Sequence, residues 1–510
     1  MEFLKNLEDK FEKTKEVRDI ADKLTDAGFE PYLVGGCLRD LLLGKNPKDW
    51  DLTTNARPEE IQKIFPDSVY ENKFGTVGIK TESEDPTLKL VEVTTFRLEG
   101  KYTDKRHPDE IKFAKTVEDD LSRRDFTVNA MAYQVSTGQR RVGGLVDPFG
   151  GKADLESKLI RAVGNPEERF QEDALRLMRA VRLGVRLGFD IEARTAAAIK
   201  KSAGLLEFIA KERIREELEK LLMTDNAAKG IEMMRELGLL KYVIGELEEG
   251  FGVEQNKHHI YTIFEHNCRA LEYAAQKNLS LDLRLASLFH DVGKPRTRAW
   301  KSDPRGAKEF RGQKGDWTFY QHQFVSEKMT LEIMDRLHFS KKTSEKVALL
   351  VREHMFVYDP EIVTEKGVRR LVRRVGAESI DDLFLLREAD RIGSGVAKAV
   401  PYRLRHLKAM IEKAKQAPLS PKMLKLNGED VMKELKIEPG PKVGLILAAL
   451  LEEAVDDPKL NTKPVLTKRA GELGKLSDKE LVELGKKAKQ SVAEVQKRID
   501  EEIKKKYFVK

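Results

Sequence analysis

The sequence predicts an α+β protein in which a small mixed α/β unit near the N-terminus is followed by all-helical regions. Three observations predict this class. Short apolar runs typical of strands are confined to residues 31–142. Gly164-Asn165-Pro166 then interrupts the chain, and the apolar residues beyond it recur with helical spacing. The length of 510 residues allows three or four domains of ordinary size.

The first unit alternates between predicted helices and strands. Each strand is a short apolar run, and glycines or prolines mark helix boundaries. The expected elements are, in order, a charged helix over 2–27, a strand over 31–34, a helix opened by Gly35-Gly36, a strand centred on Trp50, a helix from Pro58, strands over 76–80 and 90–95, and a hairpin formed by 131–135 and 140–142.

Beyond residue 160 we expect only helices, with one long helix from Glu167 to Leu187. Most of the nine histidines lie between 256 and 400, which indicates a separate module. The expected regions are an N-terminal helix (1–30), a mixed head (31–160), a helical segment (161–255), the histidine module (256–400) and a helical tail with a basic C-terminus (401–510).

Composition excludes several classes of protein. Hydrophobic residues make up 40% and charged residues 35% of the chain, which is typical of a globular protein. No apolar run approaches the ~18 residues that span a bilayer, and the charged N-terminus does not resemble a secretion signal, so we expect a cytoplasmic protein. The two cysteines, Cys37 and Cys268, exclude a disulfide framework and a cysteine-based zinc site.

The basic charge is concentrated at the C-terminus. Residues 462–510 hold 14 Lys and Arg against 8 Asp and Glu, a net charge of +6, whereas the whole chain has +7. The rest of the chain is therefore nearly balanced. Such a tail is consistent with a polyanionic partner but does not establish one.

Three carboxylates form a candidate metal site. Asp49 and Asp51 flank Trp50 in a predicted strand, where residues two apart project from the same face. Glu92 lies on a neighbouring predicted strand. Carboxylates at a strand end suit Mg²⁺, which completes its coordination with phosphate oxygens. An isolated Asp-x-Asp is more often a pair of solvent-facing residues around a core Trp50.

The Gly35-Gly36 turn favours the metal site over that simpler interpretation. A glycine pair between a strand and a helix lets the backbone approach a ligand, and a helix N-terminus favours phosphate. Together with Asp49 and Asp51, the turn describes a pocket for a nucleoside triphosphate and two metal ions.

Several linked motifs carry a family resemblance. They are Leu33-Val-Gly-Gly-Cys-Leu-Arg-Asp-Leu-Leu-Leu-Gly44, Asp49-Trp-Asp51, Arg123-Arg-Asp-Phe-Thr-Val-Asn-Ala-Met-Ala132, Asp147-Pro-Phe-Gly-Gly151 and Glu172-Asp-Ala-Leu-Arg176. In this order they resemble the class II tRNA nucleotidyltransferases, the CCA-adding enzymes of the polymerase β superfamily, and the related bacterial poly(A) polymerases. The resemblance covers about residues 30–250. It implies a nucleotidyltransferase head followed by a neck, body and tail along which tRNA lies.

The resemblance also implies roles for individual residues. Asp49 and Asp51 would hold two Mg²⁺ ions, with Glu92 as a further catalytic carboxylate. The residues implied to bind nucleotide are Gly35, Gly36 and Arg39 at the triphosphate, Arg123, Arg124, Asp125 and Asn129 at the phosphates and ribose, and Glu172, Asp173 and Arg176 at the base.

Base choice is expected to depend on Asp173 and Arg176. On one long helix, residues three apart share a face. Asp173 only accepts hydrogen bonds and Arg176 only donates them. Cytosine and adenine each offer an amino donor beside a ring acceptor, whereas guanine and uracil offer the reverse. Without the family resemblance, a surface ion pair between the two is the simpler interpretation.

The histidine module has the spacing of a second metal site. An apolar helix, Leu281 to Phe289, places His290-Asp291 at its end, and His266 and Asp390 complete the pattern. This region resembles the HD phosphohydrolases, which are fused to some CCA-adding enzymes. The resemblance implies a divalent transition metal or Mg²⁺. His259 and His322 are further candidate ligands.

We therefore expect an enzyme that adds C, C and A to the 3′ end of tRNA from CTP and ATP, with no membrane partner. A poly(A) polymerase or an A-adding enzyme fits the same motifs. The segment Arg97 to Pro108 matches a flexible loop that looks shortened in CC-only enzymes, which disfavours CC-only addition. The motifs also allow an HD phosphohydrolase with a regulatory nucleotide-binding head. A catalytically silent RNA-binding protein is disfavoured because every expected head carboxylate is present.

Overall fold

The computed structural model describes residues 7, 11, 14–70, 75–99, 111–135, 144–256, 260–302, 309–310, 313–415 and 421–509. Contacts divide the chain into two compact units. Unit 1 comprises Met1–His354 and Asp382–Ala397, and unit 2 comprises Met355–Asp381 and Lys398–Lys510. None of the helices in the described ranges is long and apolar enough to cross a membrane.

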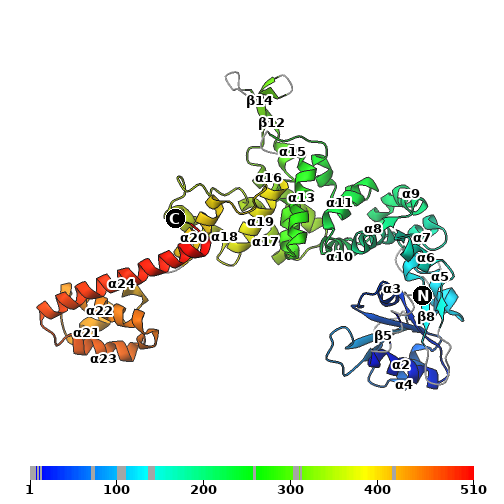
Figure 1. Cartoon of the computed structure of the whole chain (residues 1–510), viewed down its shortest axis with the longest axis horizontal. Helices are drawn as coiled ribbons and strands as arrows, with labels where there is room; N and C mark the ends of the chain where they lie inside the picture. Colours follow the sequence, from blue (N-terminus) through cyan, green and yellow to red (C-terminus); the bar gives the residue numbers. More distant parts are fainter. Residues whose placement is uncertain are drawn as a thin grey trace. The chain divides into compact units, whose positions relative to one another are not determined.

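A seven-stranded mixed sheet forms the head of unit 1 (Figure 1, blue to cyan). Its strands, in spatial order, are β3 (Val69–Tyr70), β4 (Thr76–Lys80), β5 (Leu90–Thr95), β2 (Trp50–Thr54), β1 (Pro31–Val34), β8 (Ala132–Gln134) and β9 (Leu145–Val146). Only β2 and β5 run parallel, and the other neighbours are antiparallel. This parallel pair lies at the middle of the sheet and carries the candidate carboxylates.

Short helices and one separate strand pair complete the head. They are α2 (Lys15–Asp26), α3 (Gly35–Leu42), α4 (Pro58–Ile64), α5 (Val117–Ser122), η1 (Thr127–Asn129), α6 (Gly151–Glu156), and the pair β6 (Arg97–Glu99) and β7 (Ile111–Phe113). Apolar residues of β1, β8 and α5, including Val34, Leu121 and Ala132, form a buried cluster with Phe96. That cluster fixes α5 beside the sheet and so positions the residues that follow it.

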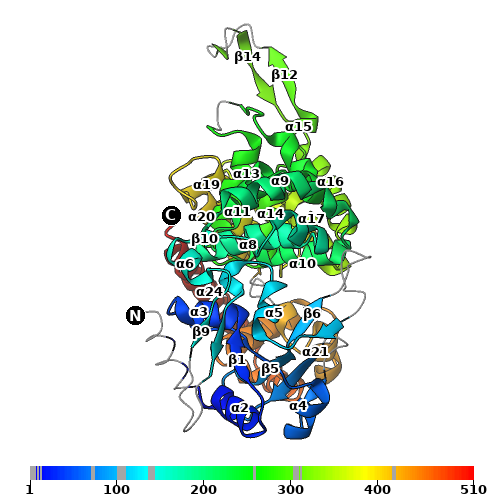
Figure 2. The ribbon, with the colours of Figure 1, turned by 90° about the vertical axis from the view of Figure 1, so that its right-hand side faces the viewer.

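The rest of unit 1 is mainly helical. Its helices are α7 (Pro166–Glu172), α8 (Arg176–Leu187), α9 (Ala193–Ser202), η2 (Ala203–Phe208), α10 (Lys211–Leu222), α11 (Ala227–Glu236), α12 (Leu240–Ile244), η3 (Gly245–Gly250), α13 (Ile263–Gln276), α14 (Leu281–Phe289), α15 (Lys294–Thr297), α16 (His322–Arg336), α17 (Lys341–Glu353) and most of α19 (Ile380–Gly393). The two views show a hairpin with strands β12 (Ala299–Ser302) and β14 (Gln313–Thr318) projecting from these helices (Figures 1 and 2).

Unit 2 is helical. Its helices are α18 (Glu365–Val375), α20 (Tyr402–Lys415), η4 (Pro421–Met423), α21 (Gly428–Leu435), α22 (Pro441–Asp456), η5 (Pro458–Leu460), α23 (Lys463–Leu473) and the long α24 (Asp478–Tyr507). Val431, Ile446, Leu450 and Leu466 form the centre of its core.

The structure corrects three of the expected elements. The helix predicted from Glu167 to Leu187 is two helices, α7 and α8, which are separated at Asp173. Short strands also occur beyond residue 160, where only helices were expected. They are β11 (Asp190–Ile191), which pairs with β10 (Leu159–Ile160) of the head, and β12, β14 and β13 (Glu309–Phe310), which pair with one another. The strand β2 begins at Trp50 instead of being centred on it. Most of the predicted first helix before residue 14, and residues 140–142 of the predicted hairpin, lie outside the described residues.

Candidate functional site

The candidate carboxylates of the head gather at the parallel strand pair. The register of β2 against β5 places Asp51 opposite Glu92, so both side chains lie on one face of the sheet. Asp49 immediately precedes β2 and is exposed. Burial raises the pKa of Asp51, an effect that Arg124 opposes and the nearby charge of Asp49 reinforces. Asp51 and Glu92 are thus neighbours across the strands with Asp49 nearby, and carboxylates are the ligands that Mg²⁺ prefers.

Gly35 brings a helix N-terminus against these carboxylates. Its φ of +68° favours glycine, and a Cβ there would lie 3.0 Å from Arg124 Nη1 and 3.7 Å from Asp51 Oδ2. The Cys37 thiol of α3 donates to the Val34 carbonyl at 3.0 Å and contacts the Asp51 carbonyl at 3.4 Å. Burial raises the pKa of this thiol to about 12, and the charge of Asp51 adds to the effect. The turn is therefore packed against β2.

Asp120 holds the two arginines of the predicted phosphate-binding motif. This fully buried carboxylate contacts Arg123 Nη2 at 2.7 Å and Arg124 Nη2 at 3.1 Å. Burial raises the pKa of Asp120, but the two guanidinium groups outweigh burial and lower it. The guanidinium groups are therefore oriented by the protein, and Arg124 lies beside Gly35.

A buried polar network joins the head to α8. Arg39 Nη1 donates to Asn129 Oδ1 at 2.7 Å, and Asn129 Nδ2 donates to Asp125 Oδ1 at 3.1 Å. Asp125 Oδ2 accepts from Arg179 of α8 at 2.6 Å. Burial opposes ionisation of Asp125, but Arg179 and Asn129 lower its pKa well below the ordinary value. Arg39, Asn129 and Asp125, which the resemblance places at the nucleotide, thus also connect the head to α8.

The Glu172–Arg176 motif lies at the break between α7 and α8, so the expectation of one continuous helical face was wrong. Asp173 has an extended backbone (φ −140°, ψ 103°), and its Oδ1 accepts from the Leu175 amide at 3.1 Å. A side-chain turn of this kind competes with helical hydrogen bonding.

Two different partners hold the candidate base-reading side chains. Asp173 Oδ2 accepts from Arg213 Nη2 of α10 at 2.9 Å. Arg176 is buried and donates to Glu172 Oε2 at 2.8 Å and to the Arg123 carbonyl at 3.0 Å. The Asp173 carboxylate and the Arg176 guanidinium are therefore each held in place by other residues and not by each other.

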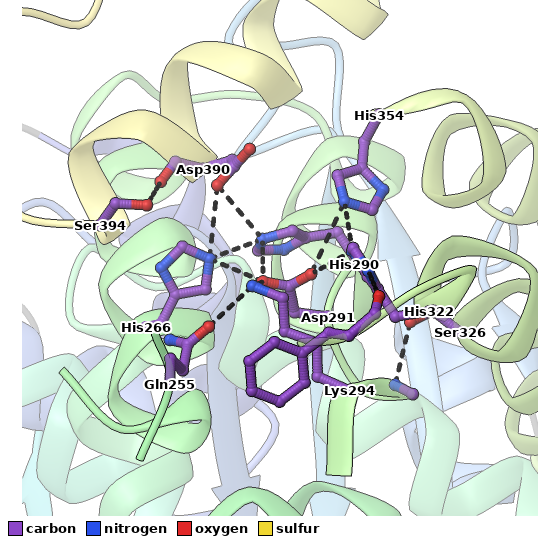
Figure 3. A network of polar contacts seen from close by, with 12 residues as sticks. Gln255, His266, His290, Asp291, Lys294, His322, Ser326, His354, Asp390 and Ser394 are labelled. Atoms are coloured by element: carbon purple, nitrogen blue, oxygen red, sulfur yellow. Dashed lines mark hydrogen bonds and ion pairs between the residues drawn. The ribbon is translucent and has the colours of Figure 1, made fainter. Parts of the chain in front are cut away.

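Six buried residues from five helices converge in the histidine module (Figure 3). They are His266 of α13, His290 and Asp291 at the end of α14, His322 at the start of α16, His354 at the end of α17, and Asp390 of α19. Their ligand atoms form two groups, each within 4.8 Å: His266, His290 and Asp390, and then Asp291, His322 and His354. The structure thus brings together all four predicted ligands and the further candidate His322, and it adds His354, which sequence reasoning missed.

Asp291 belongs to the second group and also faces the histidines of the first. Its Oδ2 is 3.0 Å from His266 Nε2 and 3.4 Å from His290 Nε2. Its Oδ1 is 3.1 Å from His322 Nε2 and 3.6 Å from His354 Nε2. One carboxylate oxygen therefore faces each pair of histidines, so Asp291 could contribute to holding a cation beside either pair.

The backbone fixes which nitrogen of three histidines faces the centre. Nδ1 of His290, His322 and His354 lies 2.8, 2.7 and 2.6 Å from a backbone carbonyl oxygen. A ring that donates its Nδ1 proton to a carbonyl presents the Nε2 lone pair when neutral. Each of these Nε2 atoms lies within 4 Å of a carboxylate oxygen, an arrangement that a proton or a divalent cation between the two would stabilise. The residues therefore fit a divalent metal.

Two cations border this cluster. Lys294 Nζ lies 2.5 Å from Asp291 Oδ2 and donates to Gln255 Oε1 at 2.7 Å, and Arg387 pairs with Asp390. Burial lowers the pKa of His290, but Asp291 and Asp390 outweigh it and raise the value to about 10. His259 and the loop over 100–110 lie outside the described residues.

Three family models match the chain in succession. The "Poly A polymerase head domain" matches residues 31–161, the "Probable RNA and SrmB-binding site of polymerase A" matches 188–251, and the "HD domain" matches 263–394. The first covers the sheet with its carboxylates, and the third contains all six residues of the buried cluster.

Several proteins named CCA-adding enzyme are similar to this chain. The enzyme of Ligilactobacillus salivarius is 45% identical over 47% of this chain, and that of Geobacillus thermodenitrificans is 40% identical over 55%. These two alignments span 56% and 65% of the relatives' own length. The enzyme of Limosilactobacillus fermentum is 32% identical over 89% of this chain and 96% of its own.

Solved structures are similar over most of the chain. The CCA-adding enzyme of Bacillus stearothermophilus, in complex with CTP, is 27% identical with a TM-score of 0.56 and covers 90% of this chain and 96% of its own. The CCA-adding enzyme of Thermotoga maritima, in complex with tRNA, is 21% identical with a TM-score of 0.50 and covers 89% and 94%. At 21% identity, the similarity to the Thermotoga maritima enzyme supports the fold alone.

Proposed function

Because this chain belongs to the family of CCA-adding enzymes, we propose that it adds C, C and A to the 3′ end of tRNA from CTP and ATP. The observation that carries the proposal is the register of the parallel strands, which places Asp51 beside Glu92 next to the Gly35 turn. A nucleoside triphosphate needs these features together: carboxylates for its metal ions, and backbone and guanidinium groups for its phosphates.

The chemistry assigned to the head is in-line nucleotidyl transfer. The 3′-hydroxyl oxygen of tRNA bonds to the α-phosphorus of the nucleotide while the bond to pyrophosphate breaks. Two Mg²⁺ ions held by Asp49 and Asp51, with Glu92 as a further carboxylate, would activate that hydroxyl and neutralise the leaving group. Arg124 lies beside Gly35 and is oriented by Asp120, so it is placed to bind phosphate oxygens.

Base choice is assigned to Asp173 and Arg176. Asp173 would accept from the amino group of cytosine or adenine, and Arg176 would donate to the adjacent ring nitrogen. Uracil and guanine would put acceptor against acceptor and donor against donor. The support is that Arg213 orients Asp173 while Glu172 and the Arg123 carbonyl orient Arg176. Fixed polar groups reject a mismatched base because they are left unpaired.

The decisive experiment supplies single nucleotides to tRNA that lacks its last three residues. CTP alone should add two C residues, ATP alone none, and both together C-C-A with no further extension. Long A tracts from ATP alone would identify a poly(A) polymerase. A single A, added only to tRNA that already ends in C-C, would identify an A-adding enzyme. The Asp49→Asn/Asp51→Asn variant is the control for contaminating activity.

A second experiment tests base choice. Asp173→Ala should lower the ratio of kcat/KM for CTP over UTP by about 100-fold, since uracil would no longer place its carbonyl acceptor against the half-buried Asp173 carboxylate. Glu168→Ala removes an exposed carboxylate from the neighbouring short helix α7 and is the matched control. An equal fall in kcat/KM for all four nucleotides would mean that Asp173 has a structural role only.

A second activity is assigned to the histidine module because its six ligand residues are complete and buried. We propose that it holds divalent metal and hydrolyses phosphate esters. Metal bound there would supply a hydroxide nucleophile at neutral pH. Lys294, held between Asp291 and Gln255, adds a buried positive charge beside the cluster for a phosphate oxygen.

Its test uses model phosphomonoesters and phosphodiesters with the whole chain. Hydrolysis should need added Mn²⁺ or Ni²⁺ and should be lost in the His290→Ala/Asp291→Ala variant, which should still add C-C-A. If the folded variant lost both activities, the two modules would not act independently. If the wild type with metal hydrolysed neither class of ester, the second activity would be refuted.

A further inference from the structure

One face of α18 is strongly basic. Five cationic side chains of this helix are exposed: Lys366, Arg369, Arg370, Arg373 and Arg374. The opposite face, with Val368, Leu371 and Val375, is buried, and α18 packs against α20 within unit 2. The helix therefore has one side packed within unit 2, against α20, and a cationic side toward solvent.

Most of this charge is not neutralised by the protein. Among the described residues, Lys366, Arg370 and Arg373 form no ion pair, and Arg369 pairs only with Glu365, one turn away on the same exposed face, at 3.5 Å. Three arginines of α8 differ in this respect. Each of them contacts a buried carboxylate, in the pairs Arg179–Asp125, Arg182–Glu217 and Arg186–Asp40.

Helix stability does not account for the arrangement. Cations in the last turn of a helix are favourable, which covers Arg373 and Arg374. Lys366 lies in the first turn, where positive charge opposes the helix dipole. Arg369 and Arg370 are three and four residues from Lys366 and from Arg373, so like charges are adjacent along the face. These residues cost the helix stability, and a ligand of opposite charge would offset that cost.

We propose that this basic face of α18 binds the phosphate backbone of RNA. The inference rests on the proposed function, which makes the RNA a tRNA. Four of the five cations are arginines, whose planar guanidinium groups bind phosphate oxygens in pairs. From Lys366 to Arg374 the helix rises by about 12 Å, enough to contact several phosphates of one strand.

The exposed face favours RNA over a lipid surface. A helix that lies on a membrane inserts an apolar face beside its basic one. The apolar residues Val368, Leu371 and Val375 are instead packed inside unit 2. The exposed side chains of α18 itself are charged, whereas the exposed apolar residues Val357 and Ile362 belong to the segment before it. A charged helix face of this kind matches a hydrophilic polyanion.

The test compares tRNA binding by the whole wild-type chain and by the Lys366→Gln/Arg370→Gln/Arg373→Gln variant across a series of KCl concentrations. If these side chains each neutralise a phosphate, the slope of log K against log salt should fall by about 2 units. Affinity near 0.1 M salt should fall by about 100-fold. The KM for tRNA in nucleotide addition should rise in parallel.

The matched control removes the same charge elsewhere. Lys328→Gln/Lys341→Gln/Lys342→Gln changes three exposed lysines of α16 and α17, and it should leave the salt slope unchanged. Unfolding midpoints of both variants confirm that they fold.

Each outcome decides between the competing explanations. An unchanged slope in the folded α18 variant would overturn the inference while leaving the proposed function intact. An equal loss in both variants would mean that only net charge matters, which also overturns it. Loss of binding to phosphatidylserine vesicles without loss of tRNA binding would make the face a membrane contact. A wild type that neither binds nor extends tRNA would overturn the proposed function itself.

Discussion

The buried histidine cluster should hold two metal ions, and removing one ligand group should leave one. Each oxygen of Asp291 faces a different pair of histidines, at 3.0 and 3.4 Å on one side and 3.1 and 3.6 Å on the other. The His322→Ala/His354→Ala variant keeps only the group of His266, His290 and Asp390, to which Asp291 can still contribute one oxygen. We therefore expect the bound metal to fall from two equivalents to one.

The assay must separate these ions from any bound in the head. Every protein is therefore prepared with Asp49→Asn and Asp51→Asn, stripped with chelator, reloaded with Mn²⁺ and freed of excess metal. Elemental analysis then gives the stoichiometry, and electron paramagnetic resonance reports magnetic coupling between neighbouring Mn²⁺ ions. His406→Ala, which removes a histidine of α20 outside the cluster, is the matched control and should retain two equivalents.

The coupling signal gives the sharper result. If Asp291 contributed one oxygen to each of two ions, these would lie close enough to couple, so the wild type should show the signal and the His322→Ala/His354→Ala variant should not. Two equivalents retained in that variant would refute the assignment of His322 and His354 as ligands. One equivalent in the wild type at saturating Mn²⁺ would refute the two-ion site altogether.

Three further predictions concern the head. Asp51→Asn should lower nucleotide addition by at least about 1000-fold while tRNA affinity in a filter-binding assay stays within about twofold, because RNA affinity comes mainly from phosphate contacts elsewhere. Gly35→Ala should raise KM for CTP, measured by initial rates, because its Cβ would displace Arg124 from 3.0 Å and alanine disfavours a φ of +68°; an unchanged KM would contradict the placement of the triphosphate. Arg179→Met should destabilise the head by about 2 kcal/mol in urea at pH 7, allowing for the partial exposure of Arg179. Since the pKa of Asp125 is lowered in the folded state, this difference should be constant above about pH 5 and shrink below about pH 4, and a difference that grows on acidification would contradict the pairing.

The sequence predicted the fold of the head well because its signals are local. The apolar runs of β1, β4 and β5 and the glycines at residues 35 and 36 are contiguous features, and the structure has strands and a helix start there. It could not predict the register that places Asp51 beside Glu92, since pairing between strands depends on contacts far apart in the chain. Strand periodicity suggested that Asp49, Asp51 and Glu92 share one site, whereas the catalytic role expected for them came from the family motifs.

The break at Asp173 and the role of His354 were missed for different reasons. Asp173 has a weak local signal, because aspartate side chains compete with helical hydrogen bonds, but the apolar periodicity around it was stronger. His354 follows α17 with no neighbouring motif, and only the packing of α14, α16 and α17 brings it to Asp291. The open basic face of α18 is visible in the sequence as Arg369-Arg370 and Arg373-Arg374, but pairing with acids can be judged only in the structure.

The burial of both thiols makes this chain a convenient host for site-specific labels. Cys37 lies under the Gly35 turn with its pKa raised to about 12 by burial, and burial likewise raises the pKa of Cys268. Such thiols are almost wholly protonated near neutral pH and shielded from reagents, so maleimides and mild oxidants should leave them intact. A single cysteine introduced on an exposed helix, such as Arg370→Cys, would then carry a fluorophore or spin label selectively. The native protein needs no cysteine removed for distance measurements between its two units.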